Sequence, residues 1–547
     1  MVAFLCYADI CGVRRYVLIA MVGLALVPAA RLAWDSRDMP HFGHLHDDSI
    51  YFVCAKSLAS GEGYRILSLP GRPYQTKYPP LLPALLSLIW RMNPRFPENL
   101  PLAMLAMWAL LPVYLLAAAR WFRDAGFGDG WSAVLCALIA LSPSLMFYSM
   151  TVMSDLLISC LLLAALLLAE RAGNAVSPVW LAPAAGVMAA CAYLTKAAAL
   201  PLIVTVPLML IWRGQRRRAF LFALTMAPAI AIWTGWVHAH RTAATDLTTI
   251  YYTDYFGFQL LNVGPRDLPL LIWKNLDSLF SGIAGLMIFD DGKSAGGVYL
   301  ARFLAIGAIL GALRLGLRRG FTQYHAFAAV YLGMLLVWHY PPNERFVIPV
   351  FPLLAAGFAS EVGLIAGLVK AARTGANRAV AAGIALALVA LAGWGVLLNF
   401  RAIAHTLPAI LRQDRAVEAS NRAAYEWIRR NAADGAFSAY DDPVFFLYTG
   451  LPAVSFRLAP MPLYYGAREP ILRPFHAMAA FARQWGLEYL FTTQADFHRE
   501  LGEAERDEVR RMQESDPAFH RVYRGRWNAV YQLEGTAPGP LMRRQRF

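Results

Sequence analysis

Charged residues are scarce in this sequence. Only 16% of the 547 residues are Asp, Glu, Lys or Arg, whereas 58% are hydrophobic and the mean hydropathy is +0.44. Soluble domains carry about 25% charged residues, so the composition argues against a soluble globular protein and against a disordered chain. The scarcity is uneven, because residues 1–400 hold 49 charged side chains and residues 401–547 hold 37. We expect a membrane region followed by a water-soluble one.

Cysteine and lysine are also rare. The six cysteines all precede residue 192 and show no metal-ligand spacing, which argues against a disulfide framework. Only six of the 50 basic residues are lysines. The net charge of +14 therefore comes mainly from arginine, and most of the excess lies in short loops between apolar runs, where it sets membrane topology. We expect no nucleic-acid partner.

Eleven apolar segments are candidates for membrane spans, each of which needs about 20 residues. They are residues 16–34, 100–119, 131–148, 155–170, 179–194, 198–212, 219–238, 298–313, 323–339, 346–367 and 379–399. Arginine clusters follow at alternate ends, so the positive-inside rule predicts a cytoplasmic N-terminus. Residues 270–289 contain Lys274, Asn275 and Asp277, which favours an interfacial helix over a twelfth span.

This topology predicts two domains in a multi-pass protein of the plasma (inner) membrane. Residues 1–400 form the transmembrane domain, with large outer loops at 35–99 and 239–297. Residues 401–547 form an extracytoplasmic domain on the periplasmic side. Its helical patterns (415–431, 476–485, 503–512) alternate with strand patterns (437–440, 487–492) and end in a hairpin (519–523 with 529–533), which predicts a small α/β layer.

The first outer loop contains the side chains that are best suited to catalysis or ligand binding. Asp47 and Asp48 lie at the expected start of a helix, which Asp48-Ser49 would cap and which would end near Ala59 or Ser60. Pro79-Pro80 then break the chain before Leu81–Met92, an apolar segment suited to the membrane interface.

Three histidines precede the aspartate pair and raise the question of a metal. His41, His44 and His46 could bind a divalent cation together with Asp47 and Asp48. Their spacing is not a strong ligand pattern, however, so a solvated loop is the favoured interpretation. We assign no metal ligand and no certain cofactor, and we leave a divalent cation open.

Several short motifs resemble the GT-C glycosyltransferases, in particular the branch that holds the aminoarabinose transferase of lipid A and the protein O-mannosyltransferases. The motifs are Asp47-Asp48 with Tyr51, Lys77-Tyr78-Pro79-Pro80, Ser142 to Asp155, Tyr193-Leu194-Thr195-Lys196, and Glu344-Arg345-Phe346 before Pro349 and Pro352. They follow the family's order over residues 1–400. Two features depart from it: Asp48 stands where a glutamate is common, and the loop 239–297 matches no family element.

The resemblance implies a fold and a reaction. The fold is a polytopic α-helical membrane protein of the GT-C type, with about 11 transmembrane helices and interfacial helices in the outer loops. The reaction is transfer of a hexose or pentose, with inversion, from a polyprenyl-phosphate donor to a lipid, glycan or protein acceptor at the outer face. An acceptor hydroxyl needs a base, and a carboxylate can supply it. The departing phosphate gains negative charge, which fixed cations stabilise.

The site residues follow from this chemistry. By resemblance Asp47 is the base, with Asp48 and Asp155 as further catalytic candidates. Lys77, Arg345 and Lys196 are candidates for the donor phosphate, and Tyr51 and Tyr78 for substrate contact. Several of them have a structural alternative: Asp47, Asp48 and Asp155 could cap helices, and Lys77 could extend from the interfacial helix.

Two other functions remain open at this stage. A transporter or flippase for a lipid-linked glycan would hold its ionisable groups at mid-membrane, whereas here the candidate residues lie at the outer ends of spans. A degenerate family member acting as a binding subunit is a third hypothesis, which the presence of both Asp47 and Lys77 disfavours. Asp290-Asp291 and the tyrosines at 251–255 suit carbohydrate contact or ordinary loop packing equally well.

Overall fold

The computed structural model describes residues 13–241, 246–254, 257–258, 263–289, 295–338, 340–372, 375–466 and 468–534. Asp290, Asp291 and Tyr255 lie outside these residues. The chain divides into two compact units, each made of segments far apart in the sequence. The first unit contains the residues up to Arg37, Met104–Ile232 and Ile272–Ala409, and the second contains Asp38–Ala103, Trp233–Leu271 and the residues from Ile410 onward.

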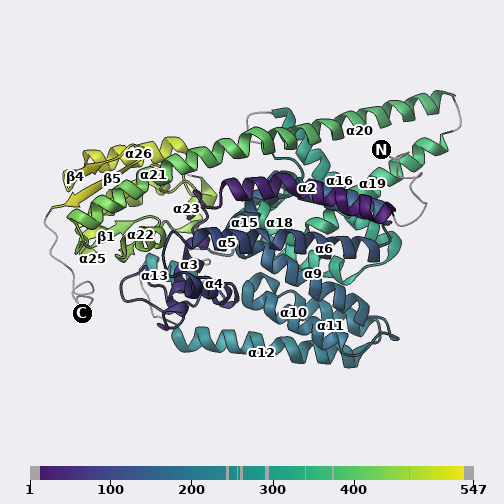
Figure 1. Ribbon diagram of the computed structural model, residues 1–547, viewed down its shortest axis with the longest axis horizontal. Helices are drawn as coiled ribbons and strands as arrows, with labels where there is room; N and C mark the ends of the chain where they lie inside the picture. Colours follow the sequence, from purple (N-terminus) through teal and green to yellow (C-terminus); the bar gives the residue numbers. More distant parts are fainter. Residues whose placement is uncertain are drawn as a thin grey trace. The chain divides into compact units, whose positions relative to one another are not determined.

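The first unit is built from helices (Figure 1). They are α2 (Val13–Asp35), α5 (Leu100–Trp108), α6 (Leu110–Asp124), α7 (Asp129–Ala140), α8 (Pro143–Ser149), α9 (Ser154–Ala172), α10 (Leu181–Thr195), α11 (Leu202–Trp212), α12 (Arg216–His240), α15 (Leu268–Met287), α16 (Ala295–Arg319), α17 (Gln323–Leu336), α18 (Glu344–Val347), α19 (Phe351–Ala371) and α20 (Gly375–Arg401). Helices α5, α12 and α15 continue across the boundaries of the unit. Helices α16 and α19 approach each other closely at Gly311, because glycine has no Cβ. A Cβ at this position would lie only 2.0 Å from the Gly357 carbonyl oxygen.

Within the described residues, six helical stretches are long and apolar enough to cross a membrane, and a bent pair could form a seventh span. The six are Tyr16–Asp35, Leu100–Asp124, Arg216–His240, Ala295–Arg319, Glu344–Ala371 and Arg378–Asn431, and the bent pair is α7 with α8. All of them coincide with predicted spans. The predicted segments at 155–170, 179–194, 198–212 and 323–339 are also helical but fall short of this test, so the count of eleven spans stays a prediction.

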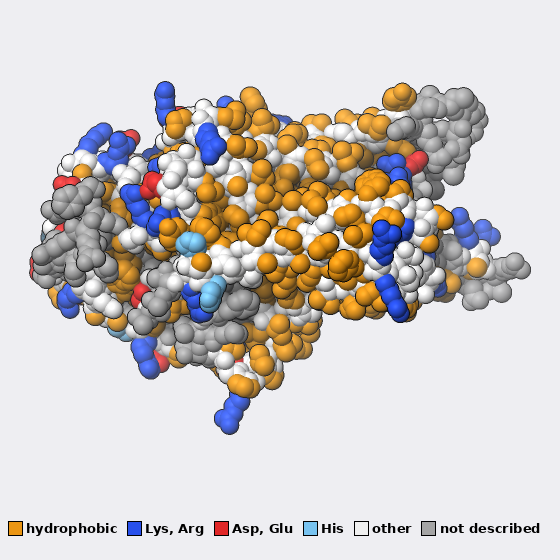
Figure 2. Space-filling view, turned by 90° about the horizontal axis from the view of Figure 1, so that it is seen from below, with side chains coloured by type: hydrophobic (Ala, Val, Ile, Leu, Met, Phe, Trp, Pro, Cys, Tyr) orange, Lys and Arg blue, Asp and Glu red, His pale blue; other side chains and the backbone are white. Residues whose placement is uncertain are grey.

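The surface of these helices suits a lipid environment. Large apolar side chains are exposed on them, such as Leu224, Ile232 and Leu317, and Figure 2 shows hydrophobic side chains over much of the visible helical surface. In water such a surface would be unfavourable by about 25 cal/mol per Å². The chain is therefore a multi-pass membrane protein.

The second unit combines helices with one mixed sheet. Its helices are α3 (Asp47–Ala59), α4 (Leu81–Met92), α13 (Leu247–Thr253), most of α21 (Leu407–Asn431), α22 (Asp442–Thr449), α23 (Pro460–Tyr465), α24 (Arg468–Leu472), α25 (Met478–Trp485) and α26 (Glu503–Ser515). The five strands are β1 (Phe437–Ala439), β2 (Ala453–Val454), β3 (Tyr489–Thr493), β4 (Phe519–Arg524) and β5 (Asn528–Leu533), in the order β2-β1-β3-β5-β4. Strand β1 runs parallel to β2 and β3, whereas β3 with β5 and β4 with β5 are antiparallel.

Both faces of the sheet are covered because apolar side chains alternate along its strands. Phe437, Phe491 and Val530 pack on one face with residues of α21 and α22. Leu490 and Tyr531, their neighbours along β3 and β5, pack into the other cluster with residues of α25 and α26. The predicted strands and hairpin are confirmed, while the two-residue strand β2 and helix α22 were not anticipated.

Two local predictions concern backbone breaks. The predicted break between the segments 179–194 and 198–212 is confirmed, since α10 ends at Thr195 and a short 3₁₀ turn, Ala197–Ala199, leads to α11. The predicted domain boundary at residue 400 falls within the continuous helical stretch Arg378–Asn431. The independence of residues 401–547 as a domain stays a prediction.

Two expectations for the first outer loop are wrong. Helix α3 begins at Asp47, so Asp48-Ser49 do not cap it; His46 occupies the capping position without a side-chain cap bond. His41 and His46 are fully buried rather than part of a solvated loop. The reason is that the loop folds inward, where the imidazole of His46 finds several polar partners among residues far along the chain.

Candidate active site

Asp47 lies at the first position of α3, in the second unit. Its carboxylate oxygen Oδ1 accepts a hydrogen bond from the Tyr78 hydroxyl at 2.6 Å. The Tyr51 ring packs edge-on against the Tyr78 ring, with centroids 5.1 Å apart. Burial, followed by the charge of Asp47, holds the pKa of the Tyr78 hydroxyl well above its usual range. Tyr78 therefore keeps its proton and orients the carboxylate as a neutral donor.

The loop that carries Tyr78 is fixed by backbone contacts within the same unit. The Gln75 side chain accepts hydrogen bonds from the backbone N–H groups of Lys77 and Tyr78 at 2.8 and 3.1 Å. Trp236 donates its indole N–H to the Gln75 carbonyl at 3.0 Å, and the Tyr64 hydroxyl donates to the Tyr78 carbonyl at 2.9 Å. These contacts keep Lys77 and Tyr78 at fixed positions beside α3.

Lys77 carries a positive charge next to Asp47's hydrogen-bond partner. Its ammonium Nζ lies 3.7 Å from the centroid of the Tyr251 ring and 5.1 Å from that of Tyr78. A cation over a ring face is stabilised by the ring's quadrupole without losing its charge. The arrangement places a partly exposed cation beside Tyr78.

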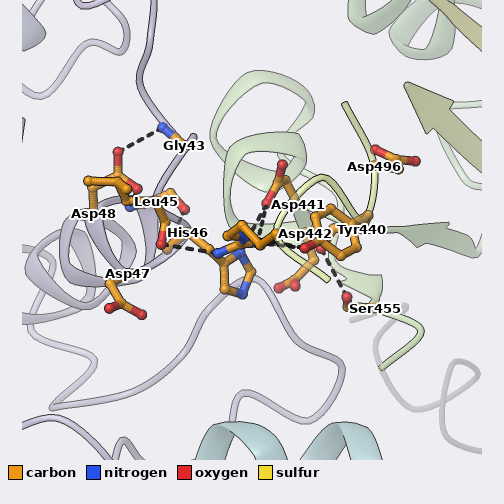
Figure 3. Close-up of polar contacts among 12 residues, drawn as sticks. Gly43, Leu45, His46, Asp47, Asp48, Tyr440, Asp441, Asp442, Ser455 and Asp496 are labelled. Atoms are coloured by element: carbon orange, nitrogen blue, oxygen red, sulfur yellow. Dashed lines mark hydrogen bonds and ion pairs between the residues drawn. The ribbon is translucent and has the colours of Figure 1, made fainter. Parts of the chain in front are cut away.

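Asp48 points away from Asp47 into the interior. Its two carboxylate oxygens accept the backbone N–H groups of Gly43 at 2.8 Å and Ser49 at 2.9 Å, and Figure 3 shows the bond to Gly43. Burial raises the pKa of the Asp48 carboxyl to about 7, against the opposite effect of these two bonds. Asp48 is completely buried, so its observed contacts are those of a residue that shapes the loop.

A buried polar cluster surrounds His46, immediately before Asp47 (Figure 3). The imidazole Nδ1 lies 3.1 Å from Oδ1 of Asp441, and Nε2 lies 2.6 Å from the guanidinium of Arg457. Burial, followed by the charges of Arg457 and Arg499, holds the pKa of His46 well below its usual range. The imidazole is therefore neutral, so Nδ1–H donates to Asp441 and Nε2 accepts from Arg457.

Further contacts complete this cluster. Tyr252 donates its hydroxyl to Asp442, and Arg457 donates to the Tyr252 hydroxyl at 2.8 Å. Burial raises the pKa of the Asp442 carboxyl to about 7. Tyr252 is completely buried, which excludes it from stacking on a sugar in this structure.

Sequence reasoning missed this cluster because its members are spread over more than 400 positions. One signal was present: Asp441-Asp442 directly follow the predicted strand 437–440, where a pair of acids in an otherwise apolar segment needs partners. Nothing in the spacing of Arg457 or Tyr252 pointed to His46.

Asp155 and Lys196 form an ion pair in the first unit. Lys196 Nζ lies 2.7 Å from Oδ1 of Asp155, whose side chain is only 2% exposed. Asp155 is in the first turn of α9, and Lys196 lies where α10 ends. Among the described residues, the second oxygen of Asp155, Oδ2, is buried and makes no hydrogen bond.

The ring of Phe346 has two predicted site cations around it. Lys196 Nζ lies 4.6 Å from the ring centroid, and the Arg345 guanidinium carbon lies 4.9 Å from it. The backbone at Phe346 is held by the Tyr331 hydroxyl, which donates to its carbonyl at 2.8 Å. The first unit thus brings Asp155, Lys196 and Arg345 together.

The eight predicted site residues therefore form two groups. Asp47, Asp48, Tyr51, Lys77 and Tyr78 belong to the second unit, and Asp155, Lys196 and Arg345 belong to the first. Among the described residues, no three His, Cys, Asp or Glu side chains come close enough to hold a metal ion. The chemistry open to these residues is that of carboxylates, ammonium and guanidinium groups and phenols: proton transfer and the binding of an anion.

Comparison with known proteins gives a fold but no sequence relative. No protein-family profile matches the chain, and no curated protein matches it in sequence. Solved structures do match. ArnT from Cupriavidus metallidurans in the apo state aligns with a TM-score of 0.53 and 15% identity, over 95% of this chain and 98% of ArnT.

Two further matches extend this result. ArnT from the same organism bound to undecaprenyl phosphate aligns with a TM-score of 0.53 and 15% identity, over 95% of this chain and 99% of that one. The oligosaccharyltransferase of Archaeoglobus fulgidus in the apo form aligns with a TM-score of 0.48 and 14% identity, over 88% and 70%. The ArnT matches show that the chain shares the fold of ArnT over nearly its whole length, as the resemblance of the motifs led us to expect.

Proposed function

We propose that the protein is a membrane glycosyltransferase that moves a sugar from a polyprenyl-phosphate donor to an acceptor, with Asp47 as general base. The observation that carries this proposal is that the Tyr78 hydroxyl orients the Asp47 carboxylate. The residue before Tyr78 in the loop is the cation Lys77, which lies near the Tyr78 ring. The fold supports the donor class, since an ArnT with the same fold binds undecaprenyl phosphate.

The reaction places one demand on each group. The acceptor oxygen or nitrogen attacks the anomeric carbon of the sugar, and the bond from that carbon to the phosphate oxygen breaks. The acceptor's proton passes to the Asp47 carboxylate, and the polyprenyl phosphate leaves with the electron pair. Attack from the side opposite the leaving group inverts the anomeric configuration. A positioned carboxylate contributes about 10²- to 10⁴-fold to such a step.

We propose Lys77 and Arg345, one in each unit, as two separate candidates for the leaving phosphate. A cation aimed at charge that develops in the transition state contributes about 10²- to 10³-fold. Lys196 is bound to Asp155, so we give the pair one role: Lys196 orients Asp155, whose second oxygen receives a polar group of donor or acceptor. Tyr51 and Tyr78 lie beside Asp47, and Asp48 stabilises the loop that precedes α3.

The proposal extends to location and substrates. The arginine pattern supports a cytoplasmic N-terminus and an extracytoplasmic position for residues 401–547. Asp47 then acts at the outer face of the plasma membrane. The donor sugar is a hexose or pentose, and the acceptor is a lipid, a glycan or a protein.

A donor panel tests the reaction class. Membranes with the wild type or with Asp47→Asn receive radiolabelled polyprenyl-phosphate sugars, and label that leaves the lipid-phosphate pool is counted. The proposal predicts wild-type transfer from one donor and a loss of about 10²-fold or more in the variant. Full transfer by Asp47→Asn overturns the role of Asp47. Absence of transfer from every donor, together with flipping of a labelled lipid-linked glycan, establishes the transporter alternative.

A further inference from the structure

The peptide before Asp47 adopts a strained turn. His46 has φ 60° and ψ −44°, and the N–H of Asp47 donates to the Leu45 carbonyl at 2.6 Å. These values describe a γ-turn with positive φ at its central residue, a rare and strained form. A residue with a side chain keeps such a conformation only where its surroundings hold it there. The strain lies one residue from the proposed general base.

Residues of the second unit hold this turn through the side chain of His46. Asp441 accepts from Nδ1 of His46, and Arg457 donates to Nε2. His46 is completely buried, and the Arg457 side chain is only 3% exposed. With both ring nitrogens in use, the imidazole has one orientation available, as Figure 3 illustrates for its contact with Asp441.

The same unit also holds the turn at its backbone. Arg499 donates from Nη1 to the Leu45 carbonyl at 3.1 Å, the acceptor that closes the γ-turn. Arg499 also lies 3.6 Å from Asp441 Oδ1. On the helix side, the His46 carbonyl accepts from the Ser49 hydroxyl at 2.8 Å and from the Ile50 N–H at 3.2 Å. The turn is therefore fixed on both sides of His46.

We propose that His46, Asp441 and Arg499 are positioning residues, which hold the strained turn so that the Asp47 carboxylate begins α3 in its reactive place. This inference rests on the proposed role of Asp47. Asp441 and Arg499 act through the turn and not on the substrate. A misplacement of about 1 Å in a catalytic group lowers a rate about 100-fold, so loss of Asp441 affects turnover more than donor binding.

The test uses the purified full-length protein and the donor identified by the panel above. Asp441→Ala removes the acceptor of the imidazole N–H, whereas Asp441→Asn keeps an oxygen that can accept it. Asp496→Ala is the matched control, because Asp496 is a carboxylate of the same unit whose observed bonds go to Thr493. We expect kcat to fall about 100-fold in Asp441→Ala with KM changed less than threefold. Asp441→Asn recovers most of the loss, and Asp496→Ala keeps wild-type kcat.

Hydrogen exchange supplies a readout that does not need activity. Mass spectrometry follows the peptide that contains the amides of Asp47 and Ile50, which are bonded within and after the turn. We expect at least tenfold faster exchange there in Asp441→Ala and no change in β3. Unchanged exchange in this peptide overturns the inference. So does an equal loss of kcat in Asp496→Ala, or a loss confined to KM.

Two outcomes keep this inference separate from the proposed function. If no donor is used by the wild type but exchange accelerates as expected, the turn is held as inferred and the assigned reaction fails. If Asp441→Ala does not fold, His46→Asn replaces it, since asparagine tolerates a positive φ but is too short to bridge the same partners. The same expectations for kcat and exchange apply, and their absence overturns the inference.

Discussion

Asp47 in the second unit and Asp155 in the first unit make different observed contacts. Asp47, in the second unit, accepts a hydrogen bond from a neutral phenol, whereas Asp155, in the first unit, is bound to an ammonium group. The phenol orients the Asp47 carboxylate as a neutral donor, and an ammonium ion at 2.7 Å compensates the charge of Asp155. The compensated charge of Asp155 fits the orienting role that we propose for its pair with Lys196.

The lysines differ in the same way. Lys77 lies over the Tyr251 ring, and Lys196 lies against a carboxylate. A ring face stabilises a cation, and a carboxylate at 2.7 Å largely neutralises the charge of Lys196. The roles of the two lysines can be compared by substituting each in turn.

Of the two lysines, Lys77 is expected to show the larger effect on activity. Loss of a cation at the leaving phosphate should lower kcat/KM about 100-fold, with partial recovery in Lys77→Arg. Lys56→Ala is a matched control, because Lys56 of the same unit also lies over aromatic rings, those of Trp90 and Phe446. Steady-state transfer in detergent measures the three variants. An equal loss at Lys56 would show that the ring contact, and not phosphate binding, matters.

At Lys196 the expected effect is on stability. Lys196→Met leaves the buried Asp155 without its observed ion-pair partner, and the loss of one partner of a buried pair costs about 3–5 kcal/mol. Since Lys196 is 19% exposed, we expect about 3 kcal/mol or less in the free energy of unfolding. The double variant Asp155→Asn with Lys196→Met should recover most of it. Chemical denaturation checks both, and equal losses in single and double variants would contradict the account.

Tyr78→Phe should have a smaller effect. It removes the hydroxyl that orients Asp47 but keeps the ring that packs on Tyr51, so we expect about a tenfold fall in kcat, near the value of one hydrogen bond to a charged group. Tyr74→Phe removes a hydroxyl of the same loop, one that accepts from Arg65 at 2.6 Å. Initial-rate kinetics compares the two variants. A tenfold fall in Tyr74→Phe as well would point to the loop as a whole.

The smallest effect is a pH dependence of stability. Burial raises the pKa of the Asp496 carboxyl to about 7, so the folded state holds a proton that the unfolded state has released above its lower, ordinary pKa. Stability should therefore fall as pH rises from about 4 to about 7, with a slope below 1.4 kcal/mol per pH unit for this partly buried group.

Asp496→Asn isolates that contribution. An asparagine can keep both bonds to Thr493 without titrating. Relative to the wild type, the variant should gain stability over the same pH interval and show no further gain above it. Thermal unfolding at several pH values measures this difference. A variant that follows the wild type at every pH would show that Asp496 is already ionised throughout.

The sequence predicted the elements that depend on local pattern. Apolar runs gave the helices that cross the membrane, and the alternation around Phe437 and Leu490 gave the strands. The group of Asp47, Tyr78 and Lys77 was also accessible, because these residues lie within one loop and match a short motif.

Long-range contacts were not accessible in this way. The contact between His46 and Asp441 joins residues 395 positions apart, and nothing in the local pattern of either residue specifies the other. The positive φ of His46 was missed for the same reason. Local propensity disfavours that conformation, and only partners supplied by the folded chain stabilise it.

The most direct test of the account separates binding from chemistry at Asp47. Donor binding and the rate of a single turnover are measured for the wild type and for Asp47→Asn, with the donor that the wild type uses. The account predicts donor affinities within about threefold of each other and a single-turnover rate at least about 100-fold lower in the variant. Equal single-turnover rates, or a loss that lies wholly in donor affinity, would contradict the role of Asp47 as the base.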